Sequence, residues 1–558
     1  MSPPSAIHVL PETDTSTFTI PDRLTLETIA KRRAASGKLV AGIAAAADVE
    51  QLKGRSSHAH KPLAKSWEHR FTAESKGRTG SSLKQAAKFL KTPGLISLGG
   101  GLPSSEYFPF EEVGFKSPVP GGVLRVSGTD GDADGNENGG VPLQDVVAGK
   151  HDMAEGKSDF DITTAFQYGQ GHGAVQLLRW MVEHTELVHD PPYRDWSCTM
   201  TVGSTSAFDM LLRMFTKPGD WVLSEEFTFP AAQETAAPMG VRFAGVGMDE
   251  HGIRAEALDE VLASWDVKAR GGPKPFLLYT VPTGQNPTGA TQPLARRRAV
   301  YAVAQKHDLL ILEDEPYYFL QMPPYDPSSP SNTTTSTPPS HKTFLATLVP
   351  SYLSLDRDGR VCRLDSFSKV IAPGTRCGWL TAPAALCARY ATHADLSTQG
   401  PSGATQLLLF KLLEDTWGHA GYLDWLLHIR AEYTARREAI LAACARYLPP
   451  DLVTWTPPMA GMFQWLRVHH RLHPDFLKGE KAAEEIEEAI FLRNVEEGTL
   501  LMKGSWFRAE REDEVHEVFF RATFAAAPAG QIEEAIRRFG VAVRGVFGVR
   551  GGDEEVGR

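Results

Sequence analysis

The segment Ser366–Leu380, SFSKVIAPGTRCGWL, is the most informative stretch of this 558-residue chain. It ends an apolar run, sets Lys369 beside two serines, and continues to Gly374, Arg376 and Gly378. A lysine amine can form a Schiff base with an aldehyde, whereas hydroxyls and a guanidinium can hold a phosphate dianion. The segment therefore fits a cofactor with an aldehyde and a phosphate, although a lysine after a strand is more often a solvated end.

The composition is that of a globular protein with at least two domains. Hydrophobic residues make up 42% of the chain, charged residues 23%, and the net charge is −10. This balance argues against nucleic acid as a general partner, and no apolar run approaches a membrane span. The five cysteines lack a C-x-x-C pair, so we expect reduced thiols and no metal site. The N-terminus lacks the features of a signal or transit peptide, which favours a cytoplasmic protein.

Strands and helices alternate between about Cys198 and Pro383. The predicted strands are Trp221–Glu225, Pro275–Pro282, Leu309–Glu313 and Val361–Phe367, and the predicted helices between them include Ser206–Phe215 and Leu294–His307. Continuous apolar strands are typical of parallel strands that are buried on both faces. The pattern predicts an α/β domain with a mostly parallel sheet.

We expect three parts in the chain. Residues 1–80 form an N-terminal extension or arm, residues 161–399 form the large domain, and residues 81–160 together with 400–558 form a smaller α+β domain. Two stretches are expected to be surface insertions, a Gly/Asp-rich one at about 117–160 and a Pro/Ser/Thr-rich one at about 323–341. The C-terminal elements are predicted at Thr405–Trp417, Gly421–Tyr447, Gly461–Val468, Glu480–Glu496, Val515–Ala525 and Gln531–Phe539.

Three motifs follow predicted strands in the same way as the Lys369 segment does. Gly203-Ser204-Thr205 opens a helix, whose N-terminus with adjacent hydroxyls suits a phosphate; a plain helix cap is the alternative. Asn286 lies in the turn PTGQNPTG, which would aim its amide at the end of the sheet, unless the turn is only structural. Phe229 could stack on a flat ring or simply pack in the core.

Two further motifs place charge in apolar surroundings. Asp314 lies in LLILEDEPYY, where a carboxylate after so apolar a strand is costly unless it serves a partner such as a protonated ring nitrogen. Tyr317 could donate to a phenolate oxygen of that ring, whereas Glu313 or Glu315 could instead cap the next turn. Arg521, within FFRATF, needs an anion, for which a substrate carboxylate or a structural ion pair would serve.

Together the motifs resemble the class I and II aminotransferases of pyridoxal-phosphate fold type I. ISLGGGLPSSEYFPF, FQYGQGHG, LYTVPTGQNPTG, LEDEPYYFLQ, DSFSKVIAPGTRCGWLT and AGMFQWL look like the fungal aromatic amino acid and 2-aminoadipate aminotransferases, with mammalian kynurenine/2-aminoadipate aminotransferase as a cousin. The resemblance covers roughly Ser81 to Phe539 apart from the two insertions.

The resemblance implies roles for individual residues around pyridoxal 5′-phosphate. The ring would be held by Lys369 through the Schiff base, Asp314 at the nitrogen, Tyr317 and Asn286 at the 3′ oxygen, and Phe229 on its face. The phosphate would be held by Ser204, Thr205, Ser366, Ser368, Arg376 and, from a partner subunit, Tyr168. The substrate α-carboxylate would be held by Arg521, Asn286 and the backbone of Gly101.

The implied reaction is a ping-pong transamination in a homodimer with shared active sites. Lys369 moves the proton of the substrate Cα, and the amino group passes from an aromatic amino acid to 2-oxoglutarate. The side chain of the preferred donor stays open among Phe, Tyr, Trp, 2-aminoadipate and kynurenine. Tyr107, Phe108 and Phe110 could line an apolar substrate pocket or pack the small domain.

Two other classes share parts of the pattern. A lyase or decarboxylase would use the same lysine. A transcriptional regulator would have a DNA-binding domain followed by a pyridoxal-phosphate domain. The basic first hundred residues are consistent with this alternative. That region has no convincing helix–turn–helix pattern, and Ala41–Ala47 resembles an apolar helix instead.

Overall fold

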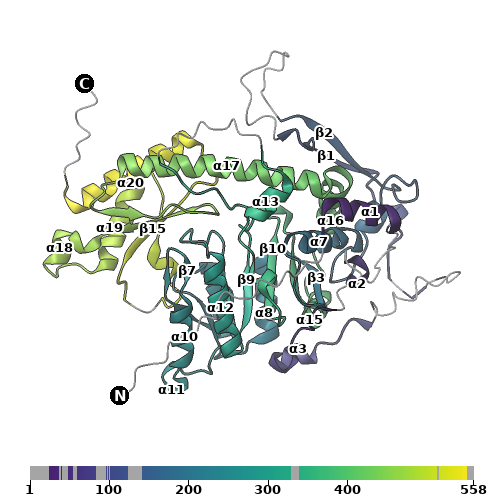
Figure 1. Cartoon of the computed structure of the whole chain (residues 1–558), viewed down its shortest axis with the longest axis horizontal. Helices are drawn as coiled ribbons and strands as arrows, with labels where there is room; N and C mark the ends of the chain where they lie inside the picture. Colours follow the sequence, from purple (N-terminus) through teal and green to yellow (C-terminus); the bar gives the residue numbers. More distant parts are fainter. Residues whose placement is uncertain are drawn as a thin grey trace, which may run out of the picture.

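The computed structural model describes residues 24–36, 39, 48–53, 60–82, 84, 96, 98–99, 101–123, 141–327, 338–511 and 514–549. These residues form a seven-stranded sheet, a four-stranded sheet and two small antiparallel pairs. In Figure 1 the large sheet lies in the middle, the C-terminal sheet lies at the left, and the long helix α17 (Gly418–Tyr447) runs along the top of both. The predicted helix at Ala41–Ala47 lies outside the described residues.

The central sheet confirms the predicted α/β fold. Its strand order is β3-β11-β10-β9-β8-β4-β5, and β11 alone runs antiparallel to its neighbours. The strand bounds are β3 Trp196–Thr201, β4 Trp221–Glu225, β5 Arg242–Val246, β8 Leu277–Thr280, β9 Leu310–Asp314, β10 Val361–Ser366 and β11 Gly378–Pro383. The four predicted strands correspond to β4, β8, β9 and β10, and every residue of β9 and β10 is buried.

Helices cover both faces of this sheet. On one face α8 (Gly203–Phe215) lies against β10 and β11, and its Phe208 ring packs on Tyr279 of β8 at 4.9 Å. On the other face lie α12 (Leu294–His307) and α14 (Tyr352–Leu355). The remaining helices of this part are α6 Ile162–Ala165, α7 Val175–Val188, α9 Pro230–Ala236, α10 Ala255–Ala263, α11 Val267–Arg270, α13 His341–Thr347, α15 Ala384–Asp395 and α16 Gly403–Phe410. The predicted helix Leu294–His307 has the observed bounds.

Strand β9 sends its carboxylates to opposite faces of the sheet, because successive side chains of a strand alternate. Asp314 lies on the α8 face, where it meets Tyr279. Glu313 and Glu315 lie on the other face. The backbone amide of Tyr352 in α14 donates to Glu313, and Arg297 of α12 donates to Glu315. The alternation therefore places Asp314 on one face of the sheet and Glu313 and Glu315 on the other, where they form a structural set.

The structural set is a buried ionic network. Arg297 Nη1 lies 3.3 Å from Glu315 Oε1, Arg363 Nη1 lies 3.3 Å from Glu313 Oε1, and Arg363 Nη2 lies 2.8 Å from Asp365 Oδ1. Three carboxylates thus face two guanidinium groups. Burial raises the pKa of the Glu315 carboxyl, and the neighbouring Glu313 adds to this effect. Glu313 and Glu315 belong to this network and were expected, in one alternative, to cap the next turn.

Glu225 is a further buried carboxyl on the same face. Thr280 Oγ1 donates to its Oε1 at 2.5 Å, and among the described residues its Oε2 has no hydrogen-bond partner. Burial raises the pKa of Glu225 to about 7. Because the folded pKa lies above the unfolded value of about 4.3, folding binds a proton here, and the stabilisation is complete below the unfolded pKa and is lost as the pH rises through 7.

We therefore predict that Glu225→Gln changes the pH dependence of unfolding. The free energy of unfolding of the variant, relative to the natural protein, should rise by about 1.4 kcal/mol per pH unit between roughly pH 4.5 and 7. Unfolding curves in urea at several pH values measure this difference. Glu256→Gln, on the exposed side of α10, is the control. Parallel curves for Glu225→Gln and the natural protein at all pH values would contradict the prediction.

The described part of the N-terminal 80 residues packs on the large domain of its own chain. Trp67 is 1% exposed and donates from Nε1 to the carbonyl of Gly359, and Phe71 packs on Phe215. Helix α1 (Leu26–Ser36) is held by Arg33, which pairs with Glu183 and Glu414. The other described helices here are α2 Val49–Leu52 and α3 Ala73–Gly77.

The two predicted insertions are described only in part. Residues 117–123 and 141–160 contribute to a β-ribbon of β1 (Glu112–Pro118) and β2 (Leu143–Gly149), which lies at the upper right of Figure 1. Residues 124–140 and 328–337 lie outside the described residues. Ala148 and Phe160 belong to the same hydrophobic core as the large sheet. The assignment of 81–160 to the small domain stays a prediction.

The C-terminal region has its own sheet and core. Its strand order is β12-β13-β15-β14, and its core includes Leu466, Phe520 and Phe539. The bounds are β12 Val453–Trp455, β13 Phe463–Val468, β14 Met502–Lys503, β15 Val518–Thr523, α18 Pro474–Leu477, α19 Ala483–Glu496 and α20 Ala529–Phe547. The predicted helix Thr405–Trp417 divides into α16 and a π-helix, Lys411–Thr416.

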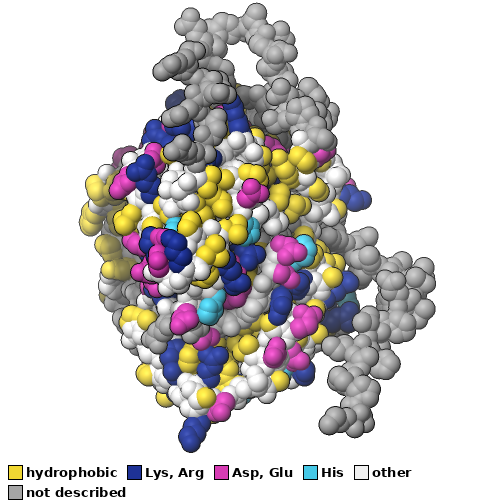
Figure 2. Space-filling model, turned by 90° about the vertical axis from the view of Figure 1, so that its left-hand side faces the viewer, with side chains coloured by type: hydrophobic (Ala, Val, Ile, Leu, Met, Phe, Trp, Pro, Cys, Tyr) yellow, Lys and Arg dark blue, Asp and Glu magenta, His cyan; other side chains and the backbone are white. Residues whose placement is uncertain are grey.

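The surface of the C-terminal region carries mixed charge. Figure 2 shows the molecule from the left-hand side of Figure 1, and on this face Lys and Arg side chains lie among Asp and Glu side chains. Glu534 of α20, for example, pairs with Arg537 and Arg538. Among the described helices, none combines the length and the apolar character that crossing a membrane requires.

Candidate active site

Five of the predicted site segments leave the same edge of the central sheet. Strands β3, β4, β8, β9 and β10 run in one direction, because β11 is antiparallel both to β3 and to β10. Their carboxyl ends lead to the segments that carry Ser204, Phe229, Asn286, Tyr317 and Lys369. Loops at this edge are the usual ligand-binding position in α/β sheets. The fold therefore gathers residues that are up to 165 positions apart in the sequence, from Ser204 to Lys369.

Lys369 is half-buried after β10, close to two guanidinium groups. Burial lowers the pKa of its amine, and the charges of Arg521 and Arg376 lower it further. A lowered pKa increases the fraction of neutral amine near pH 7, which is the form that attacks a carbonyl or accepts a proton. The sequence alone offered no basis for this shift, since Arg521 comes from the C-terminal sheet.

Asp314 is buried at the end of β9 with one oxygen engaged. Its Oδ2 accepts a hydrogen bond of 2.9 Å from the hydroxyl of Tyr279. Its Oδ1 is buried, and no described residue donates to it. Burial raises the pKa of Asp314 to about 6, and the hydroxyl groups of Tyr279 and Ser204 oppose the rise. A buried oxygen without a donor is costly, so this atom fits a ligand that brings an N–H group.

Serines and an arginine meet at the other side of Lys369. Ser366 Oγ donates to Ser368 Oγ at 2.9 Å, and Arg376 Nη1 lies 3.4 Å from Ser368 Oγ. Arg376 has a left-handed backbone with φ 45°, and its Nη2 lies 3.4 Å from the carbonyl of Val202. Gly203 has φ 77°, a conformation that favours glycine, and a Cβ there would lie 2.4 Å from Arg376 Nη2. Gly203 thus lets the guanidinium lie beside the start of α8.

Helix α8 begins at this point without a side-chain cap. Its N-cap residue is Val202, and no side chain satisfies the first amide groups. Ser204 Oγ is buried and has no hydrogen-bond partner among the described residues, and Thr205 is exposed. Free amides, hydroxyls and a guanidinium around one helix N-terminus suit a phosphate.

Arg521 joins the C-terminal sheet to the edge of the large sheet. Its Nη1 donates to Asn286 Oδ1 at 2.8 Å, and its Nε is buried without a described acceptor. The guanidinium lies over the rings of Phe463 at 4.6 Å and Phe507 at 4.7 Å. No carboxylate in the described chain pairs with Arg521. The arrangement leaves hydrogen-bonding capacity for an incoming carboxylate.

Tyr317 and Phe229 lie at the same edge. Tyr317 is buried, and its ring packs edge to face on Phe463 at 5.8 Å. Burial and the charge of Asp314 raise the pKa of Tyr317, whereas Arg521 opposes the rise. Phe229 is half-buried at the start of α9 and packs in part on the large core. The role of Phe229 in stacking on a cofactor ring stays a prediction.

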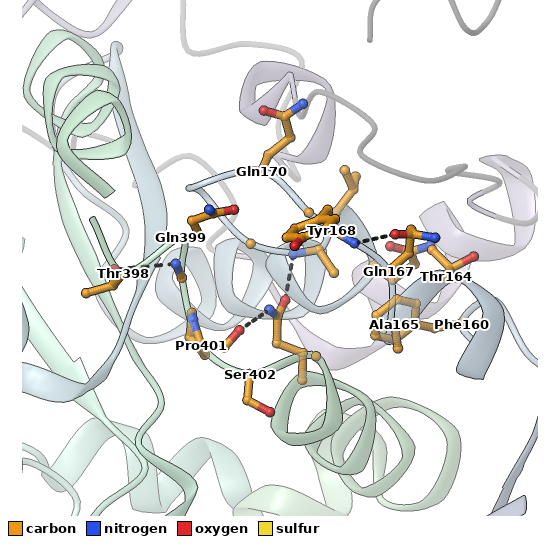
Figure 3. A pocket seen from close by; sticks show the side chains of 18 of the residues that line it. Phe160, Thr164, Ala165, Gln167, Tyr168, Gln170, Thr398, Gln399, Pro401 and Ser402 are labelled. Carbon is orange, nitrogen blue, oxygen red and sulfur yellow. Dashed lines mark hydrogen bonds between the residues drawn. The ribbon is translucent and has the colours of Figure 1, made fainter. Parts of the chain in front are cut away.

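Tyr168 and Gly101 make no described contact with Lys369 or Arg521. Tyr168 is 59% exposed and lines a cavity of about 350 Å³ together with the loop of residues 397–402. In Figure 3 its ring lies between Gln167 on one side and Gln399 and Pro401 on the other. Gly101 is exposed, and a Cβ there would meet nothing within 4 Å.

The predicted substrate aromatics are also peripheral in this chain. Tyr107 is 85% exposed, Phe110 packs edge to face on Phe166, and Phe108 packs against the large core. Three residues at the site were not given a role from the sequence, namely Tyr279, Phe463 and Phe507. Phe463 lies in the quoted motif AGMFQWL and Tyr279 in LYTVPTGQNPTG, but the contact of Tyr279 with Asp314 depends on the register of β8 with β9.

The donor and acceptor groups of the site fit pyridoxal 5′-phosphate. The unpartnered Asp314 Oδ1 suits the N–H of a pyridinium ring. The uncapped start of α8, Ser204, Ser366 and Arg376 suit the phosphate. Lys369 supplies the amine for the aldehyde.

Comparisons with known proteins agree with this chemistry. The family model described as aminotransferase class I and II matches residues 134–539. An aromatic amino acid aminotransferase of Schizosaccharomyces pombe is 41% identical over 86% of this chain and 98% of its own. The mitochondrial kynurenine/alpha-aminoadipate aminotransferase of Bos taurus is 31% identical over 84% of this chain and 96% of its own. The crystal structure of the aminotransferase Aro8 from Candida albicans is 40% identical with a TM-score of 0.80, covering 88% of this chain and 100% of that chain.

The match of the family model extends over most of the chain and includes every segment of the sheet edge described above. The relatives are matched over nearly their full length. This chain belongs to the class I and II aminotransferases, enzymes that depend on pyridoxal 5′-phosphate.

Proposed function

We propose that the protein transfers an amino group between an aromatic amino acid and 2-oxoglutarate. The observation that carries this proposal is Arg521, a guanidinium without a carboxylate partner that lies between the rings of Phe463 and Phe507. It offers a clamp for the α-carboxylate that every amino and 2-oxo acid has, and it sets aromatic walls beside that clamp. The fungal relative named for aromatic amino acids supports the same choice of donor.

Asn286 is assigned to the cofactor and Arg521 to the substrate carboxylate. Asn286 Oδ1 accepts from Arg521, so its amide NH₂ faces away from the guanidinium and is free to donate. We assign this NH₂, with the hydroxyl of Tyr317, to the 3′ oxygen of the cofactor. The remaining N–H groups of Arg521 bind the substrate α-carboxylate, with the backbone of Gly101 as a further donor. This orients the Cα–H bond of the substrate toward Lys369.

Lys369 carries the proton transfer. Bound pyridoxal phosphate supplies an aldehyde that reacts with amines and a protonated ring that accepts the electron pair released at the substrate Cα. Lys369 Nζ, whose lowered pKa increases the fraction of neutral amine, removes the proton from Cα as a general base and then returns a proton as a general acid. Asp314 Oδ1 holds the proton on the ring nitrogen. Ser204, Thr205, Ser366, Ser368 and Arg376 hold the phosphate, and Phe229 covers the ring.

The proposal predicts which amino acids react in a single half-turnover. We expect Phe, Tyr and Trp to convert the cofactor to its amine form faster than 2-aminoadipate does, because Phe463 and Phe507 present rings rather than a second cation. These rings do not distinguish kynurenine, whose side chain is also aromatic, so its rate is measured beside the others. Stopped-flow spectra of the holoenzyme mixed with each amino acid measure the rates. A faster reaction with 2-aminoadipate or kynurenine would transfer the assignment to that substrate and overturn the aromatic one.

Lys369→Ala is the matched knockout for this experiment. We expect it to lose the visible absorption of the lysine-bound cofactor and to reduce turnover by about 10⁴-fold or more. Lys342→Ala, on α13, controls for loss of a lysine elsewhere. Formation of one glutamate for each oxo acid released separates transamination from a lyase or decarboxylase reaction. Sustained multiple turnover by Lys369→Ala would be incompatible with the proposal.

A homodimer with shared active sites is the second part of the proposal. Tyr168 is exposed beside a cavity. Other exposed apolar side chains are Phe110, which packs on Phe166, and Leu396, which precedes the loop 397–402 that lines the same cavity. A second copy that covered this surface would bring its own Tyr168 toward the phosphate site of the first.

A cytoplasmic location is proposed from the sequence alone.

Mixed dimers test the sharing of sites. Tyr168→Ala and Lys369→Ala homodimers should each be weakly active or inactive. A hybrid of the two contains one site with an intact Lys369 and an intact Tyr168 of the partner subunit, so activity should return when the subunits are exchanged. Sedimentation confirms that hybrids form. If the hybrid is no more active than the homodimers, Tyr168 acts within its own chain or not at all.

A further inference from the structure

Tyr279 holds the carboxylate of Asp314 from the neighbouring strand. Its hydroxyl donates to Asp314 Oδ2 at 2.9 Å, and both side chains are buried. The ring is fixed between Phe208 of α8 at 4.9 Å and Phe243 of β5 at 6.4 Å. Asp314 Oδ1 has no described partner. The two oxygens of one carboxylate are thus in different states, one bound to the protein and one available.

We propose that Tyr279 is a positioning residue for catalysis, whose hydroxyl fixes Asp314 so that Oδ1 faces the ring nitrogen of the cofactor. This inference deepens the proposed function and rests on its assignment of Asp314 to that nitrogen. In this role Tyr279 need not touch cofactor or substrate. It acts on the orientation and the ionisation of Asp314.

The geometry explains why a tyrosine serves here. A tyrosine hydroxyl has one proton, and burial raises the pKa of Tyr279 well above its usual value, so the hydroxyl stays a donor. A donor stabilises the ionised carboxylate and opposes the effect of burial, which raises the pKa of Asp314. The ring is held by Phe208 and Phe243, so little conformational freedom is lost in making the bond.

Other groups also affect the ionisation of Asp314. From the opposite face of the sheet, Asp365 of β10 raises the pKa of Asp314 and Arg363 lowers it. The hydroxyl of Ser204 in α8 lowers the pKa of Asp314, and Asp314 in turn raises the pKa of Tyr317. None of these groups is altered by removing the hydroxyl of Tyr279, so a change in the titration of Asp314 can be assigned to that hydroxyl.

The chain contains a matched control pair. The hydroxyl of Tyr301 in α12 donates to Asp356 Oδ1 at 2.9 Å, Asp356 is buried, and burial also raises its pKa to about 6. The carboxylate of Asp356 accepts from the backbone amides of Arg360 and Val361 as well. Tyr301→Phe therefore removes a tyrosine–aspartate bond of the same length, but away from Lys369.

The test is the affinity of the apoprotein for pyridoxal 5′-phosphate as a function of pH, measured by fluorescence titration. We expect Tyr279→Phe to weaken binding at pH 7 by about 10-fold, the loss of a hydrogen bond to a charged group. The midpoint at which affinity rises with pH should move upward by about one pH unit. The kcat of the holoenzyme should show the same shift of its acid limb. Tyr301→Phe should change the melting temperature but leave the midpoint in place.

A ring-fluorinated tyrosine at position 279 gives a second measurement that keeps the shape of the side chain. Its hydroxyl is a stronger donor, so the midpoint should move to lower pH, the direction opposite to that of Tyr279→Phe. This variant also decides the question if Tyr279→Phe does not fold. Unchanged midpoints in the variants of Tyr279 would overturn the inference.

Asp314→Asn separates this inference from the proposed function. If Asp314→Asn binds the cofactor with the pH dependence of the natural protein, the assignment of Asp314 to the ring nitrogen fails. If Asp314→Asn abolishes that dependence while Tyr279→Phe behaves like Tyr301→Phe, only the role of Tyr279 fails.

Discussion

A single carboxylate buried at the end of an apolar strand is the constraint on which the site depends. Transfer of a carboxylate from water into such surroundings costs several kcal/mol unless hydrogen bonds or an opposite charge compensate it. Asp314 accepts one hydrogen bond from Tyr279, and its second oxygen has no donor among the residues that the structure describes. The fold thus holds a group whose electrostatic compensation a cationic ligand would complete. The same burial strengthens the interaction with that ligand, because the local dielectric constant is low.

The alternation of side chains along β9 makes this arrangement possible. Glu313 and Glu315 point to the opposite face, where Arg297 and Arg363 pair with them. The three successive acidic residues therefore have two different roles, because the partners on the two faces of the sheet differ. A shift of the strand register by one residue would exchange the two sets and abolish both.

Much of the site is local in sequence and was predictable for that reason. Lys369, Ser366, Ser368 and Arg376 lie in one short segment, and Asn286 and Asp314 follow apolar strands whose carboxyl ends meet at one sheet edge. The parallel order of the strands, inferred from their continuous apolar runs, sufficed to bring these segments together. The family relationship was likewise visible in the ordered motifs.

What depends on register or on contacts between domains was not predictable from the sequence. Tyr279 meets Asp314 because of the pairing of β8 with β9, and Tyr279 reads in the sequence as an ordinary core residue. Phe463 lies beside Arg521 because β13 pairs with β15 in the C-terminal sheet, and Phe507 follows β14 of the same sheet. The lowered pKa of Lys369 depends on a contact between domains, since one of its two cationic neighbours is Arg521. The antiparallel strand β11 also escaped prediction, because its length and composition resemble those of its parallel neighbours.

The most direct measurement is a crystal structure of the protein with pyridoxal 5′-phosphate bound. The account predicts a covalent link from Lys369 Nζ to the cofactor and a ring nitrogen within about 2.7–2.9 Å of Asp314 Oδ1. Tyr279 should still donate to Oδ2. A ring nitrogen that faces another residue, or an Asp314 that binds through the oxygen now held by Tyr279, would contradict it.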